Sequence, residues 1–213
     1  YTEVYAARFA SGAWSNQQVS SNASALTNAA TNNQAMPVAV STSADGTTNT
    51  VAWRSINTTI ATPTLGSALG GGEIYARRYA SGSWGAGATR ISDAASSSLN
   101  NVEDLRTNGP DSLALISSSD GATVSASWRT LNGASDGQIV AASLNGGAWT
   151  GSPSVISQAA SSTTDAATVP RLVATTSGQV VTGVWVSNTV DNTNAGVVMA
   201  VGGTVGPPAS NAT

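Results

Sequence analysis

A hairpin pattern that recurs along the chain constrains its fold more than any other feature. Residues 73–92 read EIYARRYASGSWGAGATRIS, and apolar or aromatic side chains alternate with others over the first part of this stretch. Such alternation, rich in aromatic and β-branched residues, predicts a half-buried strand. Ser81-Gly82-Ser83 supplies a turn, because glycine accepts a positive φ without steric cost. Trp84 then opens a second strand, so the stretch predicts a β-hairpin.

The same hairpin is found at three other places. EVYAARFASGAW begins at residue 3, QIVAASLNGGAW begins at residue 138, and GVVMAVGG, which has no tryptophan, begins at residue 196. A second motif precedes the later copies: a turn containing glycine and then a strand carrying Trp53, Trp128 or Trp185. Each repeat therefore holds four strands, and we expect these three tryptophans to lie between neighbouring sheets. Four-stranded units at this spacing predict an all-β, β-propeller-like array of antiparallel blades.

The pattern Tyr-Ala-Arg-Arg-Tyr, turn, Gly-x-Trp, followed by a glycine turn and Val-x-Trp-Arg, resembles sialidase-type (BNR-like) propeller repeats of exported bacterial proteins. The resemblance covers about residues 3–205. The family's Asp-box, Ser-x-Asp-x-Gly-x-x-Trp, is not reproduced, and its nearest matches are Ser43-Ala44-Asp45-Gly46 and Ser119-Asp120-Gly121. The resemblance implies propeller blades, and this departure argues against carrying over the family's activity.

The repeats divide one domain, residues 1–205, into about three and a half blades. A half-blade occupies residues 3–20, and whole blades occupy about residues 36–92, 112–157 and 170–205; residues 206–213 read as a Pro/Ser/Ala/Asn linker tail. This number does not close a ring of the usual four to eight blades. The half-blade would expose an unpaired strand edge, which can pair with another chain. Association could close a ring or build a filament; alternatively, the chain is a fragment of a longer propeller or a less regular fold.

Composition excludes several classes of function. Of 213 residues, 9% are charged, the net charge is −3, and all eight basic residues are arginines, so binding to nucleic acid is not expected. The absence of Cys and His excludes disulfides and thiolate metal sites. No apolar run approaches the roughly 20 residues that span a bilayer. The neutral, hydroxyl-rich surface and Tyr1 at the first position favour export after removal of a signal peptide, to the outside or surface of a bacterium.

No catalytic residue, cofactor or metal is predicted. Without His, Cys or Lys, acid–base chemistry falls to carboxylates or tyrosine. The acidic cluster of Glu103, Asp104 and Asp111 is interpreted as a solvated loop, with a glycosidase pair as the alternative. A sialidase-type site would need convergent arginines beside tyrosine and glutamate; the candidates, which sit at equivalent blade positions, are Arg8, Arg78, Tyr5, Tyr75 and Glu73. Asp191-Asn192-Thr193-Asn194 resembles a calcium loop, but with one carboxylate an ordinary turn is favoured.

Ligand-binding candidates lie in the repeated hairpins. Indole rings after the hairpin turns could stack on a sugar face, assisted by arginines, and the residues concerned are Trp14, Trp84, Trp149, Arg8 and Arg78. Packing at the edge of a sheet is the alternative interpretation. Three hypotheses follow, in this order: an exported structural protein that self-associates through sheet edges, a glycan-binding module, and a hydrolase. Indoles exposed in every repeat would favour the second.

Overall fold

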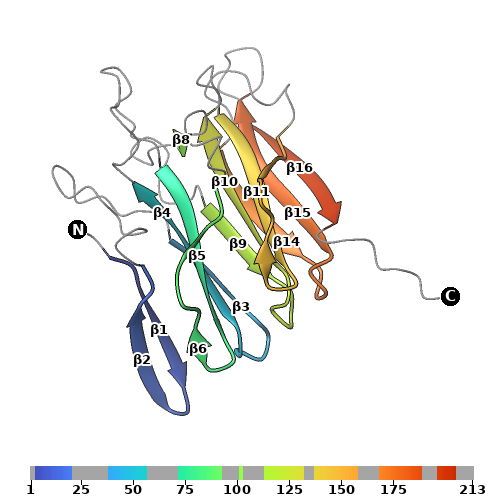
Figure 1. Cartoon of the computed structure of the whole chain (residues 1–213). Coiled ribbons are helices and arrows are strands. Elements are labelled where there is room, and N and C mark those ends of the chain that lie inside the picture. Colours follow the sequence, from blue (N-terminus) through green and yellow to red (C-terminus); the bar gives the residue numbers. More distant parts are fainter. Residues whose placement is uncertain are drawn as a thin grey trace.

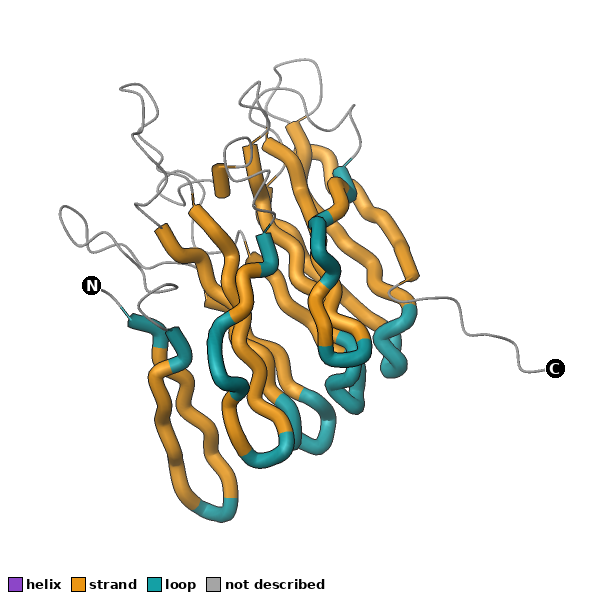
Figure 2. Tube along the Cα trace, viewed as in Figure 1, coloured by secondary structure: helices purple, strands orange, loops and turns teal. Residues whose placement is uncertain are grey.

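The computed structural model describes residues 3–20, 38–56, 72–92, 101–102, 113–131, 137–157, 168–188 and 196–204, and all regular elements in these ranges are strands. They form four antiparallel sheets arranged in a row (Figures 1 and 2). The expected all-β class, with several small antiparallel sheets, is confirmed. No helix in these ranges is long and apolar enough to cross a membrane.

The N-terminal hairpin pairs β1 (Tyr5–Ala10) with β2 (Ala13–Gln18). The first sheet has the order β3-β4-β5-β6, with β7 also on β5; its strands are β3 (Val38–Thr42), β4 (Asn49–Ile56), β5 (Gly72–Ala80), β6 (Ser83–Trp84) and β7 (Thr89–Arg90). The second sheet repeats this order with β9 (Leu113–Ser117), β10 (Val124–Leu131), β11 (Gly137–Asn145), β12 (Ala148–Trp149) and β13 (Ser154–Val155). The third sheet contains β14 (Thr168–Ala174), β15 (Val180–Asn188) and β16 (Gly196–Thr204).

Two details differ from the sequence-based expectation. Blades were expected at residues 36–92 and 112–157, but β8 (Asn101–Val102), which lies between them, pairs with Thr130 and Leu131. It can do so because β9 pairs with β10 only as far as Trp128, which leaves the end of that edge open. The hairpin expected from residue 196 is not formed: β16 continues as one strand through Gly202 and Gly203, and the third sheet has three strands among the described residues.

Neighbouring sheets stack face to face. We call the face of a sheet toward its N-terminal neighbour the upstream face and the opposite one the downstream face. The upstream faces carry the strand tryptophans, whose exposed fractions are 0% for Trp53 and 2% for Trp128 and Trp185. Trp128 packs in one cluster with Ala52 of the first sheet's downstream face, so small residues there leave room for the indole. The predicted core position of these three tryptophans is confirmed.

The first two strands of each sheet are joined by a six-residue turn of one kind, at residues 43–48 (turn 1), 118–123 (turn 2) and 175–180 (turn 3). In turn 1 the Ser43 hydroxyl donates to Asp45 Oδ1 at 2.6 Å, and Thr48 N donates to Ser43 Oγ at 3.0 Å. Ser118 makes the same two bonds in turn 2, at 2.6 and 3.0 Å. The second turn therefore begins at Ser118, one residue before the near match Ser119-Asp120-Gly121 that was named from the sequence.

The three turns stack on one another and join the sheets at one end. Ala44 N donates to the Ser119 carbonyl at 2.7 Å, and Ser119 N donates to the Thr176 carbonyl at 2.8 Å. Gly178 has φ 68°, and a Cβ added there would lie 2.8 Å from Ser118 Cβ of the preceding turn. Glycine is therefore required at this position both by its backbone conformation and by the close approach of the turns.

Candidate functional site

The N-terminal hairpin packs on the upstream face of the first sheet. Val4 and Val19 are buried there against Val51 and Trp53. Arg77 of β5 also ties the hairpin to the sheet, because its Nη1 donates to the carbonyls of Gln18 at 3.1 Å and Val19 at 3.2 Å. The position of the hairpin is thus fixed by apolar contacts along β4 and by the hydrogen bonds from Arg77 to the end of β2.

The hairpin leaves the part of this face next to β3 uncovered. Val38 and Val40 of β3 are 53% and 66% exposed, whereas Leu113, at the position of Val38 in the second sheet, is 7% exposed. The reason is the number of strands that pack on each sheet. Leu113 is covered because it lies next to β3 and β4 of the first sheet. The hairpin, which packs on the first sheet, has only the equivalents of β5 and β6, so it has no strands that could cover Val38 and Val40 in the same way. A strip of apolar surface beside β3 therefore faces solvent.

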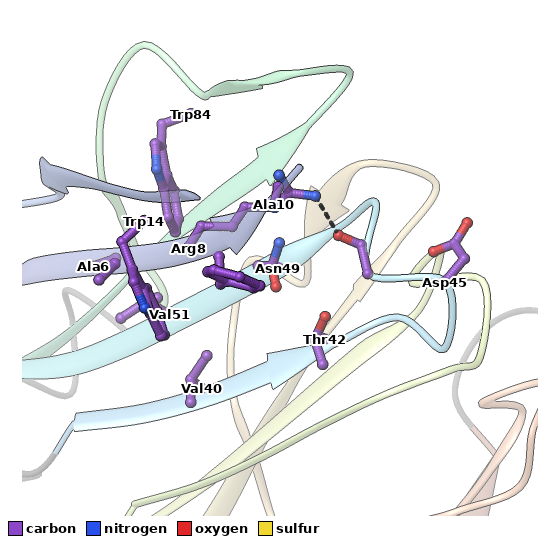
Figure 3. Close-up of a pocket in the computed structure, with 13 residues that line it drawn as sticks. Ala6, Arg8, Ala10, Trp14, Val40, Thr42, Asp45, Asn49, Val51 and Trp84 are labelled. Atoms are coloured by element: carbon purple, nitrogen blue, oxygen red, sulfur yellow. Dashed lines mark hydrogen bonds between the residues drawn. The ribbon is translucent and has the colours of Figure 1, made fainter. Parts of the chain in front are cut away.

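A groove of about 510 Å³ occupies this strip (Figure 3). All residues from 6 to 10 of β1 line it. Because successive residues of a strand belong to opposite faces, this unbroken run places the edge of β1 at the groove. The opposite wall comes from β3, β4 and turn 1, including Val40, Val51 and Gly46. We call this space the β1 groove.

Backbone groups of β1 point into the groove. Val19 N donates to the Val4 carbonyl at 2.8 Å, so the backbone of Val4 is directed toward β2. Because these directions alternate along an antiparallel strand, the N–H and C=O groups of Tyr5, Ala7 and Phe9 point away from β2. Within the described residues β1 pairs with β2 alone. The β1 groove therefore combines an open row of backbone donors and acceptors with an apolar wall.

The end of the groove at turn 1 is polar. Arg8 Nη2 donates to the Gly46 carbonyl at 3.0 Å (Figure 3). The Arg8 guanidinium also lies over the Tyr79 ring, 4.8 Å from its centroid. The Ser43 hydroxyl, followed by the N–H and hydroxyl of Thr47, lowers the pKa of Asp45 from 3.8 to about 2, because these donors stabilise the carboxylate. Asp45 is thus ionised at neutral pH.

Three of the five predicted ligand-binding residues, Arg8, Trp14 and Trp84, line the β1 groove. Trp14 is 72% exposed and packs on Phe9 with ring centroids 5.4 Å apart. Trp84 is half-buried and meets Tyr79 edge-on at 5.6 Å. Both tryptophans follow a hairpin turn, as the sequence indicated, and the packing of the hairpin on the first sheet brings them to one place.

The other two candidates lie elsewhere. Trp149 is half-buried against the cluster between the first and second sheets. Arg78 lies one sheet further along the row than Arg8. The pKa of Asp120 in turn 2 is lowered mainly by the hydrogen bond from the Ser118 hydroxyl, and the positive charge of Arg78 contributes to this shift as well. Arg8 and Arg78 therefore face different turns and do not converge. The side chains of Glu73, Glu103, Asp104 and Asp111, and residues 191–194, lie outside what the structure describes.

Sequence reasoning missed the apolar wall of the groove. Val38 and Val40 alternate with smaller residues in a short strand, which is a sign of a buried face. Their exposure depends on which strands pack opposite them, and no local pattern records that. Among the described residues there is no group of three or more His, Cys, Asp or Glu side chains that could hold a metal ion.

Comparisons with known proteins give matches among solved structures only. No protein-family model matches the chain, and no curated protein matches it. Among solved structures, it is similar to the Hadza microbial sialidase Hz136, with 14% identity and a TM-score of 0.47 over 95% of this chain and 40% of that one. It is also similar to the Trypanosoma rangeli sialidase in complex with sialic acid, with 12% identity and a TM-score of 0.46 over 90% of this chain and 29% of that one. The chain thus spans less than half of either protein, and both are sialidases, the kind of protein that the sequence pattern resembles.

Proposed function

We propose that this protein is an exported structural subunit that self-associates through β-sheet edges into a filament, sheath or layer at the cell surface. The observation that carries the proposal is the free edge of β1, which lies beside the uncovered face of the first sheet. An open edge provides directional hydrogen bonds to another strand, and the apolar wall gains from being covered.

The free edge lacks the features that usually prevent such pairing. Natural edge strands are protected by lysine, proline, bulges or inward-pointing charges. β1 reads YAARFA, has no proline, and pairs with β2 in continuous register. Its one charged side chain, Arg8, bonds to the Gly46 carbonyl at the end of the groove. The low net charge of −3 over 213 residues also gives little repulsion between copies.

The proposal is tested by light scattering over a range of protein concentration, with negative-stain images of the same samples. We expect concentration-dependent species heavier than the 21.1 kDa chain. Ala7→Pro removes an N–H that points to the groove, and we expect it to abolish association. Asn16→Pro is the matched control, because Asn16 pairs with Ala7 across the hairpin and its N–H points to the opposite edge. A monodisperse monomer at all concentrations, or equal loss in both variants, would refute self-association through this edge.

A second candidate function, glycan binding, is supported by Trp14. Its indole is 72% exposed beside a groove that also contains Arg8 and Asn49, and Asn49 Nδ2 has no hydrogen-bond partner among the described residues. An exposed aromatic face with polar groups beside it suits a sugar ring. Against this candidate, Trp84 and Trp149 are half-buried, so exposed indoles do not recur in every repeat. A monomeric protein whose binding on a glycan array depends on Trp14 would favour it.

A further inference from the structure

We propose that the β1 groove is filled by the third sheet of a second copy of this chain. In this contact β14 and β15 of one copy lie beside β1 and β2 of the next, and together they form one four-stranded sheet. The inference rests on the proposed self-association and specifies the partner segment, the strand register and the strand that is exchanged.

The strand orders of the two ends are complementary. The first sheet runs β3-β4-β5-β6, and the second runs β9-β10-β11-β12. The hairpin corresponds to the last two strands of this order, because β1 and β5 share the pattern Tyr-Ala-x-Arg and both lead into a Ser-Gly turn. β14 and β15 correspond to the first two strands, because turn 3 joins them as turns 1 and 2 join their equivalents. Joining β15 to β1 therefore restores the order seen twice in the chain.

The repeats also fix the register. Trp53 is opposite Tyr75 in the first sheet, and Trp128 is opposite Val140 in the second. The same register places Trp185 of one copy opposite Tyr5 of the other, and Val184 opposite Ala6. In the free chain β16 occupies this edge of β15, with Ala200 opposite Val184. Association thus exchanges β16 for β1 and adds β2 as the fourth strand.

Turn 1 has an empty place for a preceding turn. A Cβ added at Gly121 or Gly178 would meet the preceding turn within 3.0 Å, but one added at Gly46 meets nothing within 4 Å. In turn 2, the side chains of Ser118 and Thr123 lie against Gly178 of turn 3. Turn 3 of a second copy carries Thr175 and Val180 at these two positions, and their side chains would lie against Gly46 in the same way.

The backbone hydrogen bonds of the turns would continue in the same direction. Turns 1 and 2 each donate from the N–H of their second residue to the carbonyl of the second residue in the next turn, as Ala44 N does to Ser119 O. At the two ends of the row, the Thr176 N–H and the Ala44 carbonyl have no partner among the described residues. In the proposed contact, Thr176 of one copy donates to Ala44 of the other. Two copies joined head to tail and closed would contain six four-stranded sheets, within the four to eight that form a propeller ring.

Cysteine cross-linking tests the register. The chain has no cysteine, so Ala6→Cys and Val184→Cys can be made in separate preparations and mixed under mild oxidation. Ala6 and Val184 would form a pair without direct backbone hydrogen bonds, as Ala52 and Ala76 do, with Cα atoms about 4.5 Å apart and within the range of a disulfide. We expect a disulfide-linked heterodimer on a non-reducing gel. Ala7→Cys replaces Ala6→Cys in the control, because its side chain lies on the opposite face, and it should give no such product.

Two further variants test the exchange and the turn contact. Val184→Cys with Ala200→Cys in one chain would lock β16 onto β15 when oxidised, and we expect the locked protein to be monomeric and to associate again on reduction. Gly46→Asn fills the empty place beside turn 1 and should also abolish association. Gly146→Asn is its matched control, because Gly146 has a positive φ of 60° and likewise meets nothing within 4 Å.

The outcomes separate this inference from the proposed function. If the wild-type protein associates and Ala7→Pro prevents it, but the Ala6–Val184 link does not form, the second copy uses another segment and the inference is wrong. Association that persists unchanged in the oxidised Val184–Ala200 protein would also overturn it. If the wild-type protein never associates, the proposed function itself fails.

Discussion

The close stacking of the turns predicts that two similar glycines differ in their tolerance of a methyl group. Gly46 in turn 1 and Gly178 in turn 3 have φ values of 69° and 68°, so Gly→Ala imposes the same backbone strain at both. Their surroundings differ. A Cβ at Gly178 would lie 2.8 Å from Ser118 Cβ, 3.0 Å from Thr123 Cβ and 3.4 Å from Ser118 Cα, whereas one at Gly46 meets nothing within 4 Å.

The expected magnitudes follow from these distances. The left-handed backbone costs an alanine about 1–2 kcal/mol, and this is the whole expected effect of Gly46→Ala. At Gly178 the overlap adds about 1–3 kcal/mol, as overpacking usually does. Ser118 cannot easily move away, because its hydroxyl is bonded to Asp120 and to Thr123 N. We therefore expect Gly178→Ala to destabilise the protein by about 2–5 kcal/mol.

Urea unfolding of dilute, monomeric protein measures the difference. With a slope of about 2 kcal/mol per molar urea, the midpoint of Gly178→Ala should lie roughly 0.5–1.5 M below that of Gly46→Ala. The slope must be the same in both variants, because a change would indicate a different unfolding reaction. Equal midpoints would refute the contact between turns 2 and 3, since the backbone strain cancels in the comparison.

Two other predictions concern the core and turn 1. Trp128→Ala should destabilise the protein by about 3–5 kcal/mol because the indole is 2% exposed, and Trp84→Ala, at a half-buried position, should cost less; equal thermal denaturation of the two would contradict the packing. The pKa of Asp45 is lowered from 3.8 to about 2 in the folded protein, so its stabilising effect is present above pH 3.8 and is lost as the pH falls toward 2. Asp45→Asn should weaken this pH dependence of the urea midpoint, and an unchanged pH profile would show that the hydrogen bonds to Asp45 do not stabilise the fold.

The strands and their tryptophans could be predicted because their signals are local. Alternation over residues 74–79 indicates the strand itself, and the strand tryptophans Trp53, Trp128 and Trp185 identify the buried face in each sheet. The stacking of the turns was not predictable in the same way. Ser118 precedes Asp120 by two residues, as Ser43 precedes Asp45, but this spacing does not show that Ala44 N bonds to the Ser119 carbonyl of the next turn.

The sequence predicted the residue types of the candidate site but not which of them are exposed. The three hairpin tryptophans show the reason. Trp14, Trp84 and Trp149 share one motif, but what covers them depends on the neighbour on the upstream side. The first sheet covers Trp149, the N-terminal hairpin covers part of Trp84, and Trp14 has no upstream sheet among the described residues. A single-repeat pattern cannot encode this difference, because it arises from the position of the repeat in the row.

The same comparison links the exposed indole to the proposed assembly. If the row of sheets continues into a second copy through β15 and β1, the second sheet of that copy becomes the upstream neighbour of the hairpin. Trp14 would then lie against its downstream face, in the environment that Trp149 already has within one chain. The exposure of Trp14, the exposure of Val40 and the empty place at Gly46 would all end with this one contact. A sugar bound at Trp14 would account for the first of these features and leave the turn at Gly46 and the strip along β3 unexplained, which is why we place self-association before glycan binding.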